Sequence, residues 1–131
     1  MPVPASGGSS YFRYTPKIIR FARHGCTNRP FFHVVVMEKR FEQHRQVIEQ
    51  LGTYDPLTNQ HNEKLVALNF ERIRYWLGRG AQTSRPVEEL LGLCGFFPIH
   101  PRCYMLAWRA RRDAEKAQTT EETAKTEAQN Q

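Results

Sequence analysis

At 131 residues the chain has the length of one small domain. It holds 19 lysines and arginines against 13 aspartates and glutamates, and residues 1–112 alone hold 17 bases and 8 acids. A small domain with this imbalance repels itself unless a polyanion neutralises it, so nucleic acid is the commonest kind of partner. A charge that serves solubility alone is the alternative.

The cysteines and the apolar runs exclude two further classes of protein. Cys26, Cys94 and Cys103 are odd in number and irregularly spaced, which argues against a disulfide framework and favours a reducing compartment. No apolar run approaches the roughly 18 to 20 residues that span a bilayer, so we expect no membrane association. Residues 1–16 are rich in Ser, Gly and Pro and contain no acid. We expect a flexible extension there that is compatible with a targeting segment.

The first half of the packed region is predicted to form strands. Residues 17–23 alternate, with Ile19 and Phe21 on one face and Arg20 on the other. Residues 31–39 are aromatic and β-branched and predict a second, buried strand paired with the first. Residues 47–57 and 64–69 predict two shorter strands separated by a hydrophilic loop.

Two helices are predicted after the strands. Asn69 is a good N-cap for a helix that ends at Gly78 and Gly80. A second helix begins near Thr83 or Ser84, places Cys94 on its apolar stripe and ends at Gly95. We therefore predict an α+β fold, in which a small, mostly antiparallel or mixed sheet of about four strands packs with two helices over residues 17–95.

The C-terminal third divides by composition. Residues 96–112 mix apolar and basic residues and suggest an arm that lies on a partner. Residues 113–131 contain no aromatic or branched apolar residue, so they are expected to be disordered or to form a solvated helix.

The stretch Arg23-His24-Gly25 raises an enzymatic hypothesis. Arg-His-Gly at the end of a strand is how the histidine phosphatases present a nucleophilic imidazole, but there the strand leads into a helix of a larger α/β fold. Here a second strand follows within about six residues, and the chain is too short for that architecture. We therefore expect no catalysis.

Cys26 is the one candidate metal ligand. No Cys or His pair in the chain has the spacing of a closed zinc site, but Cys26 lies in a polar turn between Arg23 and Arg29, where positive charge favours the thiolate. We hypothesise that Cys26 donates one ligand to a zinc ion or an iron–sulfur cluster that a partner protein completes.

The basic residues are predominantly arginines, which suit forked contacts to phosphates and stacking on bases. They recur through the first strand, after the second strand and around the helices, and some, such as Arg72 and Arg74, are equally explained as solvated helix faces. The predicted RNA contacts are Lys17, Arg20, Arg23, Arg29, Lys39, Arg40, Arg79 and Arg85.

Four ordered motifs carry a family resemblance: "RFARHGCTNRPFFHVVV", "VIEQLGTYDPL", "LNFERIRYWLGRGAQTS" and "PVEELL". Over residues 17–94 the chain resembles the small-subunit ribosomal protein S16 family of bacterial-type ribosomes. The resemblance implies a structural protein that binds small-subunit ribosomal RNA, supports subunit assembly and contacts neighbouring ribosomal proteins without forming a homo-oligomer. It also implies RNA-facing positions at Arg20, Arg23, His24, Arg29, Arg40 and Arg79, with Gly80 and Thr83 shaping the turn between the helices.

The chain departs from the family pattern at three places. Cys26 stands where the family has a small or basic residue, and Arg45-Gln46 stands where the family has Gly-Arg. Extensions flank the shared region at both ends. The long extensions, the acid-free start and Cys26 together suggest the mitochondrial version, located in the matrix and acting in mitochondrial translation.

Overall fold

The computed structural model of the protein describes residues 15–129. Residues 1–14 of the predicted N-terminal extension and the last two residues of the tail lie outside the described range. The elements in chain order are β1 (Lys17–Cys26), β2 (Arg29–Glu38), β3 (Glu49–Tyr54), β4 (Val66–Leu68), α2 (Phe70–Gly78), β5 (Gln82–Thr83), α3 (Arg85–Leu93) and α4 (Pro101–Gln129).

The strands form one mixed sheet in the order β4-β3-β2-β1-β5. Neighbouring strands are antiparallel except for β1 and β5, which run parallel. The predicted α+β class is confirmed, as are the four strands expected from the sequence. The fifth, β5, is a two-residue strand that pairs with Ile18 and Ile19 of β1.

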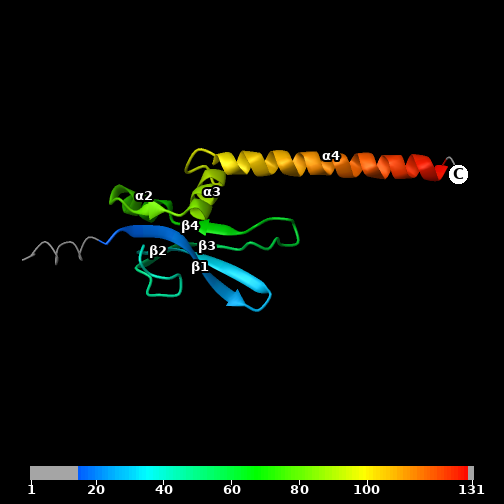
Figure 1. Ribbon diagram of the computed structural model, residues 1–131. Helices are drawn as coiled ribbons and strands as arrows, with labels where there is room; N and C mark the ends of the chain where they lie inside the picture. The colour runs from blue at the N-terminus through cyan, green and yellow to red at the C-terminus, as the bar shows by residue number, and fades with distance from the viewer. Residues whose placement is uncertain (1–14, 130–131) are drawn as a thin grey trace, which may run out of the picture. The chain divides into compact units, whose positions relative to one another are not determined.

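One face of the sheet carries the main core and α2 (Figure 1). Ile19 of β1 lies opposite Val36 of β2 in the sheet, and both are fully buried. Ile73 is the buried residue of α2. Burial of each of these side chains contributes about 1.5–3 kcal/mol, so this layer is the main apolar contribution to the fold.

The loop over residues 39–48 covers part of the opposite face. Phe41 and Val47 of this loop pack against Ala22, Val35 and Met37, which are all buried. The loop therefore closes a second, smaller apolar cluster that faces away from α2.

The helix ends follow the expected chemistry. The Asn69 side chain accepts a hydrogen bond from the Arg72 backbone N–H at 3.3 Å, which confirms the predicted N-cap of α2. α3 begins at Arg85 and ends at Leu93. Cys94 is therefore outside the helix and exposed, so its predicted place in the core is wrong. The prediction extended the apolar stripe of the helix to Cys94, one residue past the helix end at Leu93.

Of the described residues, 15–87 form one compact unit and 88–129 form a second. In the second unit, α4 is one continuous helix of 29 residues, and nearly all its described side chains are exposed. The expected boundary at residue 112 falls inside this helix, and the segment after it is helical as far as Gln129, which is one of the two forms expected for it. Alanine, glutamate, lysine and glutamine favour a helix, and no Gly or Pro follows Pro101, which explains its length. None of the described helices is long and apolar enough to cross a membrane.

Candidate nucleic-acid interface

The end of the β1–β2 hairpin extends beyond the rest of the sheet. Pairing between β2 and β3 stops at Phe32 and Tyr54, whereas β1 and β2 remain paired as far as Cys26 and Arg29. Residues 23–29 are all exposed. In Figure 1 this two-stranded end projects away from the other strands. His24 therefore lies in a hairpin whose first strand leads directly into a second strand, as the sequence predicted. In the histidine phosphatases the corresponding strand leads into a helix.

The backbone of the turn depends on two residues with positive φ. Asn28, at the second position of the two-residue loop, has φ 61°, and Gly25 has φ 99°. A Cβ atom at Gly25 would lie 2.3 Å from the carbonyl oxygen of Arg29. Close approach of the two strands at this point requires glycine, and it holds Cys26 and Arg29 side by side at the tip.

One face of the hairpin carries stacked imidazoles. The rings of His24 and His33 are 4.1 Å apart and nearly parallel, and Phe31 meets His33 edge-on at 5.6 Å. Burial lowers the pKa of His33, and the positive charge that His24 can carry lowers it further. The lowered pKa favours the neutral form of the His33 ring, which suits stacking.

The other face of the hairpin combines aromatic rings with Arg23. Phe21, Phe32 and Tyr54 form a cluster in which Phe21 lies 5.6 Å from each of the other two rings. Arg23 is opposite Phe32 in the sheet and is exposed. Within residues 15–129 its guanidinium has no hydrogen-bond or ion-pair partner, so its full donor fork is available to a phosphate.

Arg29 is anchored to the protein. Its Nη2 lies 3.0 Å from Oδ2 of Asp55, and this carboxylate is mostly buried while the arginine side chain is 59% exposed. The other carboxylate oxygen of Asp55 accepts the Leu57 backbone N–H at 3.1 Å. Arg29 is thus oriented by Asp55 and still presents donors to solvent.

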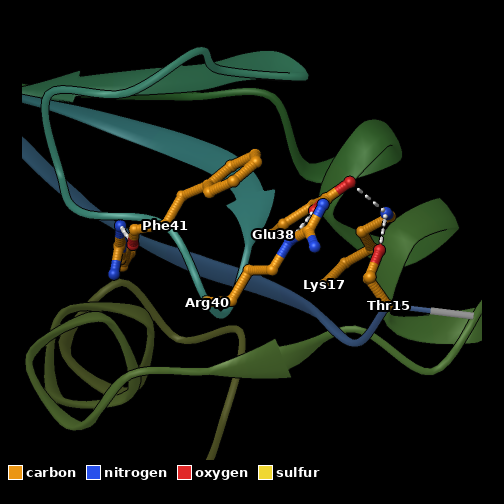
Figure 2. Close-up of polar contacts among 6 residues, drawn as sticks. Thr15, Lys17, Glu38, Arg40 and Phe41 are labelled. Atoms are coloured by element: carbon orange, nitrogen blue, oxygen red, sulfur yellow. Dashed lines mark hydrogen bonds and ion pairs between the residues drawn. The ribbon is translucent and has the colours of Figure 1, made fainter. Parts of the chain in front are cut away.

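A second group of charges lies where β1 begins and β2 ends. Figure 2 shows Glu38 between Lys17 and Arg40, with Glu38 oxygens 3.4 Å from the lysine Nζ and 2.8 Å from the arginine Nε. Lys17 also donates to Thr15 at 2.9 Å. Desolvation acts to raise the pKa of Glu38, but the hydrogen bonds and charges of Arg40 and Lys17 outweigh it and hold that pKa below its usual value. One carboxylate therefore serves two cations, and the group keeps a net positive charge.

Arg20 lies differently from the expectation. Its guanidinium donates to the backbone carbonyl of Phe41, and its Nε lies 2.9 Å from the sulfur of Met37. The predicted face of the strand is correct, but the loop over residues 39–48 covers that face. Arg20 holds this loop against the sheet, and its donors are directed to the protein.

The remaining predicted contacts are spread over the surface. Lys39 is exposed and donates to the Gln82 side chain at 2.9 Å, between the β2 end and β5. Arg79 follows α2, is exposed, and donates to the Tyr75 hydroxyl at 2.6 Å. Arg85 is exposed at the first residue of α3. The structure thus brings Arg23, His24 and Arg29 together at the hairpin end, and Lys17, Lys39 and Arg40 together at the other end of the same strands.

Several residues of this surface were not predicted from the sequence. His33 and Tyr54 contribute rings to the hairpin faces, and alternation alone gave no reason to single them out. Arg72, which was read equally as a solvated residue, forms a two-pronged ion pair with Glu49. Only the tertiary contact between α2 and β3 reveals that pairing.

Cys26 is exposed at the tip of the hairpin. Among the residues that the structure describes, no three Cys, His, Asp or Glu side chains come together in a way that could hold a metal ion. A metal at Cys26 would therefore need most of its ligands from another molecule.

The first half of α4 is an exposed apolar and basic surface. Tyr104, Met105, Leu106 and Trp108 are each between 47% and 59% exposed. Arg109, Arg111 and Arg112 follow them directly, whereas acids outnumber bases from Asp113 onward. Large exposed apolar residues that are adjacent mark a site of interaction.

Comparison with known proteins identifies the family. The family model described as ribosomal protein S16 matches residues 23–84, which include the hairpin end and α2. A Drosophila melanogaster protein named small ribosomal subunit protein bS16m is 60% identical over 125 residues, covering 95% of this chain and 97% of the relative. The chain belongs to the ribosomal protein S16 family.

Two more distant S16 relatives match a shorter part. The bS16m protein of Caenorhabditis elegans is 57% identical over 93 residues, covering 68% of this chain and 63% of the relative. An Arabidopsis thaliana protein named bS16m/bS16c is 44% identical over 87 residues, covering 66% of this chain and 64% of the relative. At 125 residues, the Drosophila match is long enough to include most of α4.

Proposed function

We propose that this S16 protein is a structural constituent of the mitochondrial small ribosomal subunit, where it binds ribosomal RNA and supports assembly and translation. The observation that carries the proposal is the near full-length match to a protein named small ribosomal subunit protein bS16m. The family and the name of the Drosophila relative indicate a structural protein and not an enzyme, and His24 stacks on the His33 imidazole in an exposed hairpin.

The β1–β2 hairpin end is the proposed RNA contact. Arg23 supplies a guanidinium that has no partner within residues 15–129 to phosphate oxygens, and Arg29 supplies a guanidinium that Asp55 orients through an ion pair. The His24, His33 and Phe31 rings on one face and the Phe21, Phe32 and Tyr54 rings on the other suit stacking with unpaired bases. Phosphate contacts would give affinity and position, and stacking would favour single-stranded segments.

The cations near the other end of β1 and β2 are proposed as a second set of phosphate contacts. Lys17, Lys39 and Arg40 lie close together there, with Glu38 as the shared acid. Arg79 and Arg85 extend the positive surface around the helices. Arg20 supports this surface indirectly, because it fixes the loop that carries Lys39 and Arg40.

The test is salt-dependent binding of the purified chain to a transcript of the small-subunit ribosomal RNA. Arg23→Gln removes a cation that has no partner in the described protein, so the fold should be unaffected while the affinity falls. The slope of log K against log salt should decrease by about 1. Lys125→Gln, which removes one charge from the acidic half of α4, is the matched control and should leave both quantities unchanged. Equal binding by wild type and Arg23→Gln would contradict the proposed contact.

We propose further that Cys26 donates one thiolate to a zinc ion or iron–sulfur cluster shared with a neighbouring ribosomal protein. Its exposure at the hairpin tip supports this proposal, because a partner can reach the sulfur without any change of fold. Small subunits assembled with Cys26→Ser should lose one metal site, whereas subunits with Cys94→Ser, another exposed cysteine, should keep it. Stoichiometric metal on the isolated chain would contradict a shared site.

The first half of α4 is proposed to bind a neighbouring protein of the subunit. The exposed Tyr104, Met105, Leu106 and Trp108 need an apolar surface, which a phosphate backbone does not offer. The arginines that follow them fit acidic groups at the rim of such a surface.

A further inference from the structure

The surface between the start of β1 and the end of α2 is hollowed into a pocket of about 390 Å³. The residues that line the pocket come from the start of β1 and from the segment between α2 and β5. They are Thr15, Pro16, Lys17, Trp76, Arg79, Gly80, Ala81 and Gln82. The volume is within the range of small-ligand sites, which begins at about 300 Å³. Neither the hairpin end nor α4 contributes to it.

The aromatic wall of the pocket is held in a fixed orientation. Nε1 of Trp76 donates to Oε2 of Glu49 at 2.9 Å, so the only polar atom of the indole is already satisfied within the protein. Tyr75 meets the indole edge-on, with ring centroids 5.5 Å apart. Because the ring is tethered at its nitrogen and only partly buried, its exposed surface is available for stacking.

Two cations stand at the pocket beside this wall. The Arg79 guanidinium donates to the Tyr75 hydroxyl at 2.6 Å and lies 5.5 Å from that ring's centroid, and within residues 15–129 its other donors have no hydrogen-bond or ion-pair partner. The Lys17 ammonium is bonded to Thr15 and pairs with Glu38 at 3.4 Å. Glu38, which contacts Lys17, and Glu49, which contacts Trp76, also form ion pairs with the arginines Arg40 and Arg72. The pocket therefore attracts an anionic group next to a flat apolar one.

The lining of the pocket is open at Gly80 and polar at Gln82. Gly80 has φ 87°, and a Cβ atom there would meet no atom within 4 Å. Gln82, whose side-chain oxygen accepts a hydrogen bond from Lys39, contributes an amide to the lining. An aromatic wall, two cations and an amide are the components of a nucleotide site.

We propose that this pocket receives one unstacked nucleotide of single-stranded ribosomal RNA, with the base against Trp76 and the phosphate against Arg79 and Lys17. The inference deepens the proposed RNA-binding function and rests on it. A free anion would need only the cations, and a peptide side chain would not require both cations beside the indole. A single nucleotide uses the wall and the cations together.

The chain contains two tryptophans, so the full-length Trp108→Phe variant makes Trp76 the only indole reporter. Its fluorescence would be titrated with a single-stranded oligoadenylate, the same strand in a duplex, and inorganic phosphate. We expect quenching by the single strand, at least tenfold weaker binding of it by the Arg79→Gln variant, and little change in the Arg74→Gln variant, whose arginine is on α2 but does not line the pocket. Quenching by the duplex with equal affinity, or by phosphate alone, would overturn the proposal.

Binding of the whole small-subunit ribosomal RNA, measured in parallel by filter retention, separates the two levels of inference. If the RNA binds and oligoadenylate leaves Trp76 emission unchanged, the pocket assignment is wrong and the RNA-binding function stands. If the ribosomal RNA itself does not bind, the proposed function fails, whatever the fluorescence shows.

Discussion

Arg72 of α2 donates two hydrogen bonds to the carboxylate of Glu49 in β3. Nε lies 2.6 Å from Oε1 and Nη2 lies 2.7 Å from Oε2. Trp76 donates to the same carboxylate. One acid thus joins α2 to the sheet and sets the position of the indole that walls the pocket. Such forked, charge-assisted pairs are stronger and more specific in geometry than single contacts.

Replacing this acid by its amide tests the connection. We expect Glu49→Gln to lower the melting temperature by several degrees, because the amide cannot accept from the arginine fork and the indole as a carboxylate does. Glu42→Gln, at an exposed loop position, is the matched control and should leave the melting temperature unchanged. Thermal unfolding followed by circular dichroism measures both, and equal melting temperatures for the two variants would count against a role for Glu49 in stability.

The same pair predicts a dependence of stability on pH. The hydrogen bonds from Arg72 lower the pKa of Glu49 below its ordinary value of 4.5, despite an opposing effect of desolvation. A carboxyl whose pKa is depressed by folding stabilises the protein above its unfolded pKa and loses that contribution as the pH falls through the folded pKa. The difference in urea unfolding midpoint between wild type and Glu49→Gln should therefore be constant near neutrality and shrink below pH 4.5. A difference that grew in acid would contradict this assignment.

The pKa of His33 should lie below its ordinary value. Burial lowers its pKa first, and the charge on the stacked His24 ring lowers it further. The ring proton resonances of His33, followed by NMR from pH 5 to 8, should show a midpoint under 6.5. The His24→Gln variant should move this midpoint upward without restoring it fully, because the burial remains. An unchanged midpoint in His24→Gln would show that the two rings are not coupled.

The sequence predicted the sheet well where local patterns determine it. Alternation and β-branched residues located β1 to β4, and Asn69 located the start of α2, because these signals depend on neighbouring residues. β5 was missed because two residues have no pattern of their own and pair only through the register with β1. The hydrogen bond from Arg20 to the Phe41 carbonyl was missed because it depends on a loop 21 positions along the chain.

The basic character of the site was predictable, but its arrangement was not. Composition and arginine content indicated RNA binding and correctly placed Arg23 and Arg29 at the hairpin. Whether an arginine faces solvent or an internal acid depends on partners such as Asp55, which is 26 positions from Arg29 in the chain. The helical form of residues 101–112 was missed because Pro101 was read as part of an arm, although proline is well tolerated at the first residue of a helix.

The stability of the protein should be highly sensitive to substitution of one glycine in the hairpin turn. Gly25→Ala places a methyl group 2.3 Å from the Arg29 carbonyl oxygen at φ 99°, so the strands must separate or the turn must change. We expect a loss of stability of about 2 kcal/mol or more. Gly78→Ala, at the last residue of α2 where a Cβ meets nothing within 4 Å, should have no destabilising effect. Urea unfolding of both variants measures the contrast, and equal stabilities would contradict the close approach at Gly25.

The exposed apolar residues of α4 should matter for assembly and not for folding. Trp108 is 59% exposed, so Trp108→Ala should leave the unfolding midpoint of the isolated protein unchanged. Its incorporation into small subunits should fall several-fold if a neighbouring protein covers this surface. Thr119→Ala, in the polar half of the helix, serves as the comparison. Normal incorporation of Trp108→Ala would remove α4 from the set of protein contacts.

The most direct test of the ribosomal role is sedimentation of the tagged, full-length protein from a mitochondrial lysate on a sucrose gradient. The account predicts that the wild-type protein migrates with the small ribosomal subunit. It also predicts that the double variant Arg23→Glu and Arg29→Glu moves largely to the top of the gradient. Wild-type protein found only in free fractions, away from the small subunit, would contradict the ribosomal role.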